Sequence, residues 1–168
     1  MKIFLIGFMG SGKSHWGPQL SAKVGLPFFD LDTVIVEKEK KQITEIFAEK
    51  GEEYFRYLEK AVLEELVENN NEFIISCGGG TPCFFNNIRF MKNKGTVIWL
   101  NTQADVLVNR LLKEKTSRPV LKDIADEELK PYILKKILGR KLYYEQADII
   151  VNEESLSVDT FAEIIINA

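Results

Sequence analysis

Short apolar segments alternate with longer segments of helical periodicity along this chain. The apolar segments lie at residues 3–6, 28–29, 73–75, 96–100 and 148–151. Each is short and is separated from the next by helical material. Apolar runs that alternate with helices are typical of a parallel sheet covered on both faces. The pattern therefore predicts an α/β fold with three layers, α/β/α, around a five-stranded parallel sheet.

Two segments depart from this simple alternation. Residues at about 32–69 have helical periodicity, with apolar positions such as Ile46 and Phe55, and exceed a minimal crossover. This helical insertion has room for a substrate-binding subdomain. Residues at about 113–130 are charged and poorly periodic, which predicts a loop between two helices. We interpret this loop as a lid on a single domain that spans residues 1–168.

Composition narrows the classes of function. The chain has 168 residues, 45% of them hydrophobic, which suits one domain with a sizeable core. Its net charge of −3 provides no general basic surface, so we expect no nucleic-acid partner. The apolar start of the chain reaches Gly7 too soon for a signal sequence or a membrane span. We expect a cytoplasmic monomer without a membrane partner.

The two cysteines do not indicate a metal site. Cys77 and Cys83 lie on either side of a glycine run, and no second Cys/His pair is present to complete a zinc site. We expect both to be reduced thiols.

A phosphate-binding motif follows the first predicted strand. Residues 7–14 read Gly-Phe-Met-Gly-Ser-Gly-Lys-Ser and fit G-x-x-x-x-G-K-[ST]. The glycines let backbone N–H groups approach phosphate oxygens at a helix N-terminus. Lys13 would contact the β and γ phosphates and Ser14 would bind Mg²⁺; a glycine-rich turn without a ligand is the alternative. The predicted ATP contacts in this loop are Met9, Gly10, Ser11, Gly12, Lys13 and Ser14.

Two acidic residues, Asp30 and Asp32, close the second predicted strand. The carboxyl ends of strands in an open α/β sheet face the ligand crevice, so both side chains are candidates for a reaction site. An acceptor hydroxyl benefits from a carboxylate that orients it and takes its proton, and we predict this role for Asp32. Asp is also a favoured helix cap, so Asp32 as the N-cap of a helix beginning at Thr33 stays open.

Arginines and glycines supply further candidates. Arg56 lies early in the long helix of the insertion, where an unpaired surface arginine is the default expectation. Gly78, Gly79 and Gly80 follow the third predicted strand, and their backbone either passes close to a bound substrate or forms a tight turn. Arg118, in the predicted lid, either closes over the phosphates and stabilises transition-state charge or faces solvent.

One more arginine lies near the end of the chain. Arg140 and Tyr144 are four residues apart and hence on one face of a helix. Arg140 is suited to a bidentate clamp on a carboxylate, and a surface pair with Glu145 is the competing interpretation.

These motifs, in this order, resemble those of the shikimate kinases, a family of P-loop kinases with an adenylate-kinase-like core. The resemblance covers nearly the whole chain. The phosphate loop alone indicates only nucleotide binding, whereas the set together is far more specific. The other motifs are F-D-L-D at 29–32, G-E-x-x-F-R at 51–56, G-G-G at 78–80, R-P-V-L at 118–121 and R-x-x-x-Y at 140–144.

The resemblance implies transfer of the γ-phosphate of ATP to the 3-hydroxyl of shikimate, giving shikimate 3-phosphate and ADP in aromatic amino acid biosynthesis. Asp32 would hold this hydroxyl and act as the base. Arg56 and Arg140 would bind the shikimate carboxylate, and the backbone of residues 78–80 would line the substrate. The implied partners are therefore shikimate and ATP, with Mg²⁺ as the cofactor.

On the nucleotide side, the resemblance implies that Asp30 supports Mg²⁺ through water beside Ser14. Arg118 would contact the phosphates and act in catalysis together with Lys13 and Asp32. Arg110, on the helix before the lid, looks like the family residue that packs near adenine.

The chain departs from the family pattern at three places. His15 follows Ser14 where a threonine is common, and we interpret it as a local variation and not as a catalytic base. The stretch after Arg140 is one residue shorter than in many members, so either Tyr143 or Tyr144 fills the usual tyrosine position. Residues 152–155 lack the arginine with which some members contact adenine, and backbone groups would serve there instead.

Two other functions share part of this sequence pattern. Another P-loop metabolite kinase, for gluconate or a nucleoside monophosphate, would need acceptor contacts other than Asp32, Arg56 and Arg140. A non-catalytic module that uses ATP as a conformational signal is disfavoured by a full catalytic set, which here comprises Lys13, Ser14, Asp32 and Arg118. A panel of acceptors assayed with ATP distinguishes the three.

Overall fold

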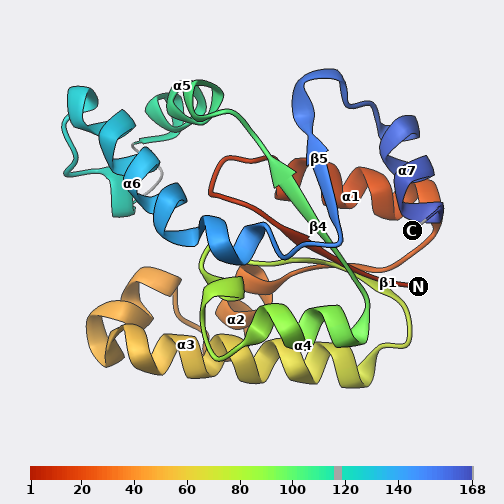
Figure 1. Cartoon of the computed structure of the whole chain (residues 1–168). Coiled ribbons are helices and arrows are strands. Elements are labelled where there is room, and N and C mark those ends of the chain that lie inside the picture. Colours follow the sequence, from red (N-terminus) through yellow and green to blue (C-terminus); the bar gives the residue numbers. More distant parts are fainter. Residues whose placement is uncertain (116–118, 168) are drawn as a thin grey trace.

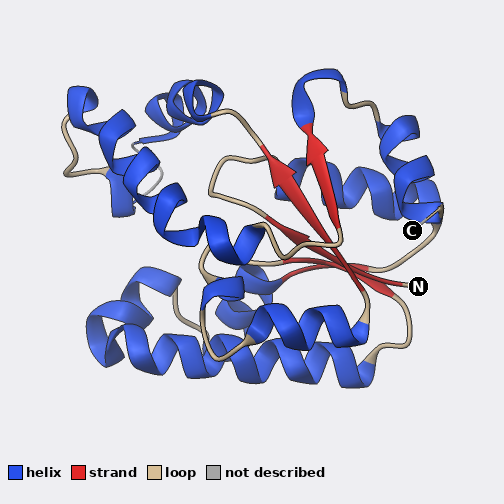
Figure 2. Cartoon of the chain, in the orientation of Figure 1, coloured by secondary structure: helices blue, strands red, loops and turns tan. Residues whose placement is uncertain are grey.

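The computed structural model describes residues 1–115 and 119–167, and a twisted parallel sheet lies at its centre (Figure 1, Figure 2). Its strands run in the order β2-β3-β1-β4-β5, and every neighbouring pair is parallel. The predicted α/β class and the five parallel strands are confirmed. The strands are β1 (Lys2–Ile6), β2 (Phe28–Asp30), β3 (Phe73–Ser76), β4 (Thr96–Asn101) and β5 (Ile149–Asn152).

Helices cover both faces of the sheet (Figure 2). On one face, α1 (Lys13–Val24) packs against α7 (Val158–Ile166). On the other lie α2 (Leu31–Glu39), α3 (Ile43–Asn69) and α4 (Asn87–Lys94), with α2 packed against α3. These helices exclude water from the strands, which explains why the strands read as continuous apolar runs in the sequence.

The first strand shows how the two faces are built. Successive side chains of a strand point to opposite faces of a sheet. Phe4 and Ile6 accordingly join the core under α2, α3 and α4, while Ile3 and Leu5 join the core under α1 and α7. β1 is therefore buried on both sides, and it ends directly at the predicted phosphate loop.

The helical insertion consists of α2 and α3. Gly51 interrupts α3 with φ of 80° and ψ of 172°, so two helical segments meet there at a kink. A residue with a Cβ rarely adopts this φ, which gives Gly51 a structural reason. The second segment begins with Glu52 and carries Arg56 one turn later.

A third apolar cluster joins the phosphate loop to α5 (Ala104–Glu114) and α6 (Asp126–Tyr144), which pack against each other. Between these helices lies the short 3-10 helix η3 (Pro119–Leu121). The loop predicted at 113–130 is thus shorter in the structure, because α6 already begins at Asp126. Acidic residues fill the first turn of α6, where the helix dipole favours them, and their charge made a helix start resemble a loop.

Two further 3-10 helices, η1 (Thr81–Cys83) and η4 (Glu153–Ser155), follow β3 and β5. None of the helices among the described residues is long and apolar enough to cross a membrane.

Candidate active site

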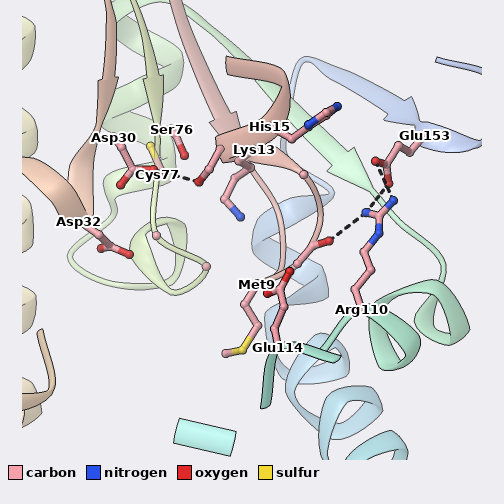
Figure 3. A pocket seen from close by; sticks show the side chains of 15 residues that line it. Met9, Lys13, His15, Asp30, Asp32, Ser76, Cys77, Arg110, Glu114 and Glu153 are labelled. Atoms are coloured by element: carbon pink, nitrogen blue, oxygen red, sulfur yellow. Dashed lines mark hydrogen bonds and ion pairs between the residues drawn. The ribbon is translucent and has the colours of Figure 1, made fainter. Parts of the chain in front are cut away.

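A cavity of about 490 Å³ lies at the carboxyl ends of β1, β2 and β3. Its wall includes the loop after β1, both acids at the end of β2 and glycines after β3. Asp30 and Asp32 lie on one side of it, Arg110 and Glu153 on the other, and Lys13 between them (Figure 3). Ligand crevices of open parallel sheets are found at this end of the strands. The cavity is therefore the candidate active site.

The loop between β1 and α1 has the backbone that phosphate binding requires. Gly10 and Gly12 have φ angles of 80° and 90°, in the left-handed region that favours glycine. Gly12 is the N-cap of α1, so the free N–H groups of the first helical turn follow it directly. Such a helix N-terminus attracts anions. The predicted ATP contacts of this loop that line the cavity are Met9, Gly10, Gly12, Lys13 and Ser14.

The Lys13 side chain is held by the phosphate loop itself. Its Nζ donates hydrogen bonds to the carbonyl oxygens of Gly7 (2.8 Å) and Phe8 (3.0 Å) and lies 3.4 Å from Ser11 Oγ. Ser11 is buried within the loop and does not line the cavity. These contacts keep the ammonium group at the cavity wall, where it can meet a phosphate.

Ser14 and Asp30 form the predicted metal-binding pair. Ser14 Oγ donates a hydrogen bond of 3.2 Å to Asp30 Oδ2. Mg²⁺ prefers such oxygen ligands, and it usually keeps waters and substrate phosphates in its remaining positions. Within residues 1–115 and 119–167, no three His, Cys, Asp or Glu side chains gather to form an all-protein metal site. The pair therefore fits a magnesium ion that arrives with a nucleotide.

The helix cap at the end of β2 is Asp30, not Asp32. Helix α2 begins at Leu31, and the backbone N–H of Thr33 donates to Asp30 Oδ1 at 3.2 Å. The alternative in which Asp32 caps this helix is therefore wrong. The strand passes into the helix without a loop, so the cap comes two residues earlier and Asp32 lies in the first turn. Its carboxylate lines the cavity.

The environment of Asp32 raises the pKa of its carboxyl group to about 6. Asp32 is an exposed residue, but its carboxyl group faces the cavity, and desolvation there is the main cause; the nearby carboxylates of Asp30 and Glu59 act in the same direction. Lys13 and Arg56 oppose the shift. Asp32 can therefore change its protonation state close to neutral pH, as a general base requires.

This shift predicts a pH dependence of turnover. A base acts in its deprotonated form, so kcat/KM should fall about tenfold per pH unit below about pH 6. The measurement is kcat/KM from pH 5 to pH 8, with both substrates below saturation so that the free protein is titrated. A flat profile over this range would contradict the predicted role of Asp32 as the base.

Arg56 is buried and paired, unlike the surface arginine that is the default expectation. It is 9% exposed, and its Nη1 donates to Glu59 Oε2 at 2.9 Å. Glu59 is itself 1% exposed and accepts a hydrogen bond of 2.6 Å from Thr81 Oγ1. The ring of Phe84 lies 4.3 Å from Arg56 Cζ, within range of a cation–π interaction. These contacts fix the direction of the guanidinium group.

The glycine run after β3 allows two arginines to approach the backbone closely. A Cβ at Gly80 would lie 2.6 Å from Nη2 of Arg56, and one at Gly79 would lie 3.1 Å from Nη1 of Arg140. At Gly78 a Cβ would lie 2.9 Å from Glu59 Oε1. The sequence offered a tight turn or close approach to a substrate. The structure shows the tight turn, which is closed by a 3.1 Å hydrogen bond from the backbone N–H of Thr81 to the carbonyl oxygen of Gly78, together with close approach by these side chains.

The tyrosine of the R-x-x-x-Y motif is Tyr144. Its ring is fully buried, and its hydroxyl donates a hydrogen bond of 2.6 Å to the carbonyl oxygen of Gly79. Burial raises the pKa of Tyr144 to about 12, so it remains a neutral donor. Tyr143 is exposed. Tyr144 thus anchors α6 to the glycine run beside Arg140, and Glu145 pairs with Lys141 rather than with Arg140.

Arg110 lies at the opposite wall of the cavity. Its Nη1 donates to the carbonyl oxygen of Gly10 at 3.0 Å, which joins α5 to the phosphate loop. It also forms a two-pronged ion pair with Glu153, at 2.9 and 3.0 Å. The predicted lid arginine, Arg118, lies outside the described residues.

Sequence reasoning missed three residues that contact the arginines of this site. Glu59 had a detectable signal, because it is three positions after Arg56 and therefore on the same helix face. Phe84 and Glu153 had none, since each meets its arginine only through the folded chain.

Together, the sheet, the phosphate loop and the acids at the end of β2 define the class of this protein as a P-loop kinase. The chain belongs to the shikimate kinase family, whose sequence profile matches residues 9–168. It is 40% identical over 162 residues to the shikimate kinase of Azobacteroides pseudotrichonymphae genomovar. CFP2, covering 96% of this chain and 95% of that protein.

Solved structures agree with this membership. The crystal structure of shikimate kinase from Bacteroides thetaiotaomicron matches with a TM-score of 0.91 and 38% identity, covering 99% of this chain and 97% of that one. Shikimate kinase from Acinetobacter baumannii, in complex with shikimate, matches with a TM-score of 0.86 and 29% identity, covering 99% and 90%.

Proposed function

We propose that the protein is a shikimate kinase that transfers the γ-phosphate of ATP to the 3-hydroxyl of shikimate, yielding shikimate 3-phosphate and ADP. The observation that carries this proposal is one cavity lined by a phosphate loop and by Asp32, next to a glycine run that contacts Arg56 and Arg140. An acceptor that carries both a carboxylate and a hydroxyl needs arginines for its carboxylate and an acid beside the phosphate loop for its hydroxyl. The membership of the shikimate kinase family supports the same substrate pair.

On the nucleotide side, the N–H groups at the start of α1 and the Lys13 ammonium group bind the phosphates of ATP. Ser14 would hold Mg²⁺ and Asp30 would support it through water; a bound ion would supply positive charge for the phosphates of ATP. Arg110 packs near the adenine. The 3.2 Å contact between Ser14 and Asp30 supports a shared role of these two residues at the magnesium site.

On the acceptor side, Asp32 orients the 3-hydroxyl and takes its proton as the new P–O bond forms and the bond from the γ-phosphorus to the bridging oxygen of ADP breaks. Phosphoryl transfer passes through a loose transition state, so positioning and charge neutralisation matter more than covalent help. Arg56 and Arg140 bind the shikimate carboxylate, and the backbone of residues 78–80 lines the substrate. The segment at 32–69 is the shikimate-binding part of a single domain in a cytoplasmic, monomeric protein.

The segment at 113–130 acts as a lid in this proposal, with Arg118 on the phosphates. Closure would exclude water and limit wasteful hydrolysis of ATP. Amide hydrogen exchange with and without Mg·ATP tests it: added nucleotide should increase protection in this segment. Unchanged protection would count against a lid.

A coupled assay of ADP release tests the function directly. Mg·ATP is supplied with shikimate, gluconate, a nucleoside monophosphate or no acceptor. Turnover that depends on shikimate alone is the expected result. Turnover with another acceptor, or with none, would overturn the choice of substrate while leaving the phosphate-loop fold in place.

A further inference from the structure

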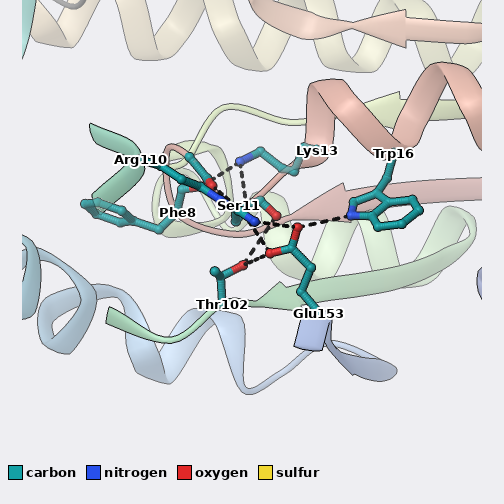
Figure 4. A network of polar contacts seen from close by, with 8 residues as sticks. Phe8, Ser11, Lys13, Trp16, Thr102, Arg110 and Glu153 are labelled. Atoms are coloured by element: carbon teal, nitrogen blue, oxygen red, sulfur yellow. Dashed lines mark hydrogen bonds and ion pairs between the residues drawn. The ribbon is translucent and has the colours of Figure 1, made fainter. Parts of the chain in front are cut away.

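Glu153 connects four segments of the nucleotide side through one carboxylate (Figure 4). It accepts hydrogen bonds from Trp16 Nε1 on α1 (3.3 Å) and from Thr102 Oγ1 after β4 (3.1 Å). It also holds both terminal nitrogens of Arg110 on α5, and Arg110 in turn donates to the phosphate loop at Gly10. A surface acid with an incidental partner would not collect four donors.

The Arg110–Glu153 pair forms a wall shared by two cavities. Beside the first cavity lies a second, of about 470 Å³, at the carboxyl ends of β4 and β5, and both residues line each cavity. The phosphate loop fixes the phosphates in the first cavity, so the nucleoside half of ATP must extend into a neighbouring space. Trp16, Gln103 and Val106 line the second cavity together with the pair. A planar guanidinium at the shared wall is placed to stack on a base.

We propose that Glu153 is a positioning residue for nucleotide binding, which holds the Arg110 guanidinium at this wall before ATP arrives. This role rests on the proposed ATP-dependent function. Arginine has large rotamer freedom, and fixing such a side chain in advance lowers the cost of binding a ligand against it. The two-pronged pair fixes both the position and the plane of the group.

The positioning role of Glu153 can be distinguished from a direct effect of its charge on the phosphates. Glu153 Oε1 would lie 3.1 Å from a Cβ at Gly12, so an unpaired carboxylate here would repel the phosphates. Arg110 neutralises it. Removing the Glu153 charge therefore leaves phosphate binding equal or tighter, because the positive charge of Arg110 is no longer neutralised, while contact with the nucleoside is weakened. Loss of the Glu153 charge should therefore weaken binding of the nucleoside half of ATP without weakening binding of the phosphates.

The test compares ATP with inorganic tripolyphosphate, which carries the phosphates alone, by calorimetry in the presence of Mg²⁺. Glu153→Gln should weaken ATP about 3- to 10-fold and leave tripolyphosphate unchanged or tighter. In turnover assays KM for ATP should rise by the same factor, with KM for shikimate and kcat within about twofold. Glu163→Gln, an exposed acid on α7, controls for loss of charge and should match wild type.

A double-mutant cycle shows whether Glu153 acts through Arg110. In an Arg110→Ala background, Glu153→Gln should cause no further decrease in the ratio of the affinity for ATP to the affinity for tripolyphosphate. Arg110→Lys keeps the charge without the fork and should reproduce the loss, which provides a second route if Glu153→Gln folds poorly. Additive losses, or wild-type affinity ratios in Glu153→Gln or Arg110→Lys, would overturn the proposal. Absence of shikimate-dependent turnover in wild type would instead overturn the proposed function. The two failures can be told apart, since the comparison of ATP with tripolyphosphate binding needs no acceptor.

Discussion

Replacing Asp32 with asparagine is expected to lower kcat with shikimate by about 10²- to 10⁴-fold and to leave the Kd of ATP nearly unchanged. Asparagine keeps the shape of the side chain and can still hydrogen-bond a hydroxyl, but it cannot take a proton. Asp32 belongs to the first turn of α2, apart from the phosphate loop that holds the nucleotide. Steady-state kinetics and calorimetry with ATP measure the two effects separately.

A measurement of the stability of Asp32→Asn tests whether unfolding causes the loss of turnover. The pKa of Asp32 rises from 3.8 to about 6 in the folded protein, so folding favours its protonated form. Stability should therefore fall as the pH rises through this window. A neutral asparagine escapes this loss, and its unfolding midpoint at pH 7 should equal or exceed that of wild type. Asp159→Asn, an exposed residue paired with Lys23, is the control. Turnover of Asp32→Asn within tenfold of wild type would remove Asp32 from the role of base.

The features that the sequence predicted well are those encoded locally. The strands appear as apolar runs because both of their faces are covered, so hydrophobicity alone marks them. The phosphate loop is contiguous, and its glycines have a direct backbone reason in the positive φ angles of Gly10 and Gly12. Asp30 and Asp32 were placed at the site by the general rule that strand ends face the crevice.

The features that escaped prediction depend on partners far apart in the chain. Arg56 is held by Phe84, and Arg110 by Glu153, 43 positions away. Periodicity and propensity carry no information about such pairs. The start of α6 at Asp126 was missed for a different reason: a run of charges fits both a loop and the first turn of a helix.

The contacts of Arg56 lead to the second large expected effect. Arg56→Ala should raise KM for shikimate about 100-fold, because each charge-assisted hydrogen bond to a carboxylate contributes about 1.5–3 kcal/mol. It should also lower the free energy of unfolding by about 3–5 kcal/mol, since the buried carboxylate of Glu59 loses its ion partner. Urea unfolding and steady-state kinetics measure the two losses.

A second substitution separates these losses. In Arg56→Ala/Glu59→Gln the buried charge is removed with its partner, so most of the lost stability should return; the glutamine oxygen can still accept the hydrogen bond from Thr81. KM for shikimate should stay high, because the guanidinium of Arg56 is absent and only that of Arg140 is left to bind the carboxylate. Recovery of a wild-type KM in the double variant would show that Arg56 has only a structural role. Binding of the acceptor carboxylate would then have to be assigned to Arg140 by itself.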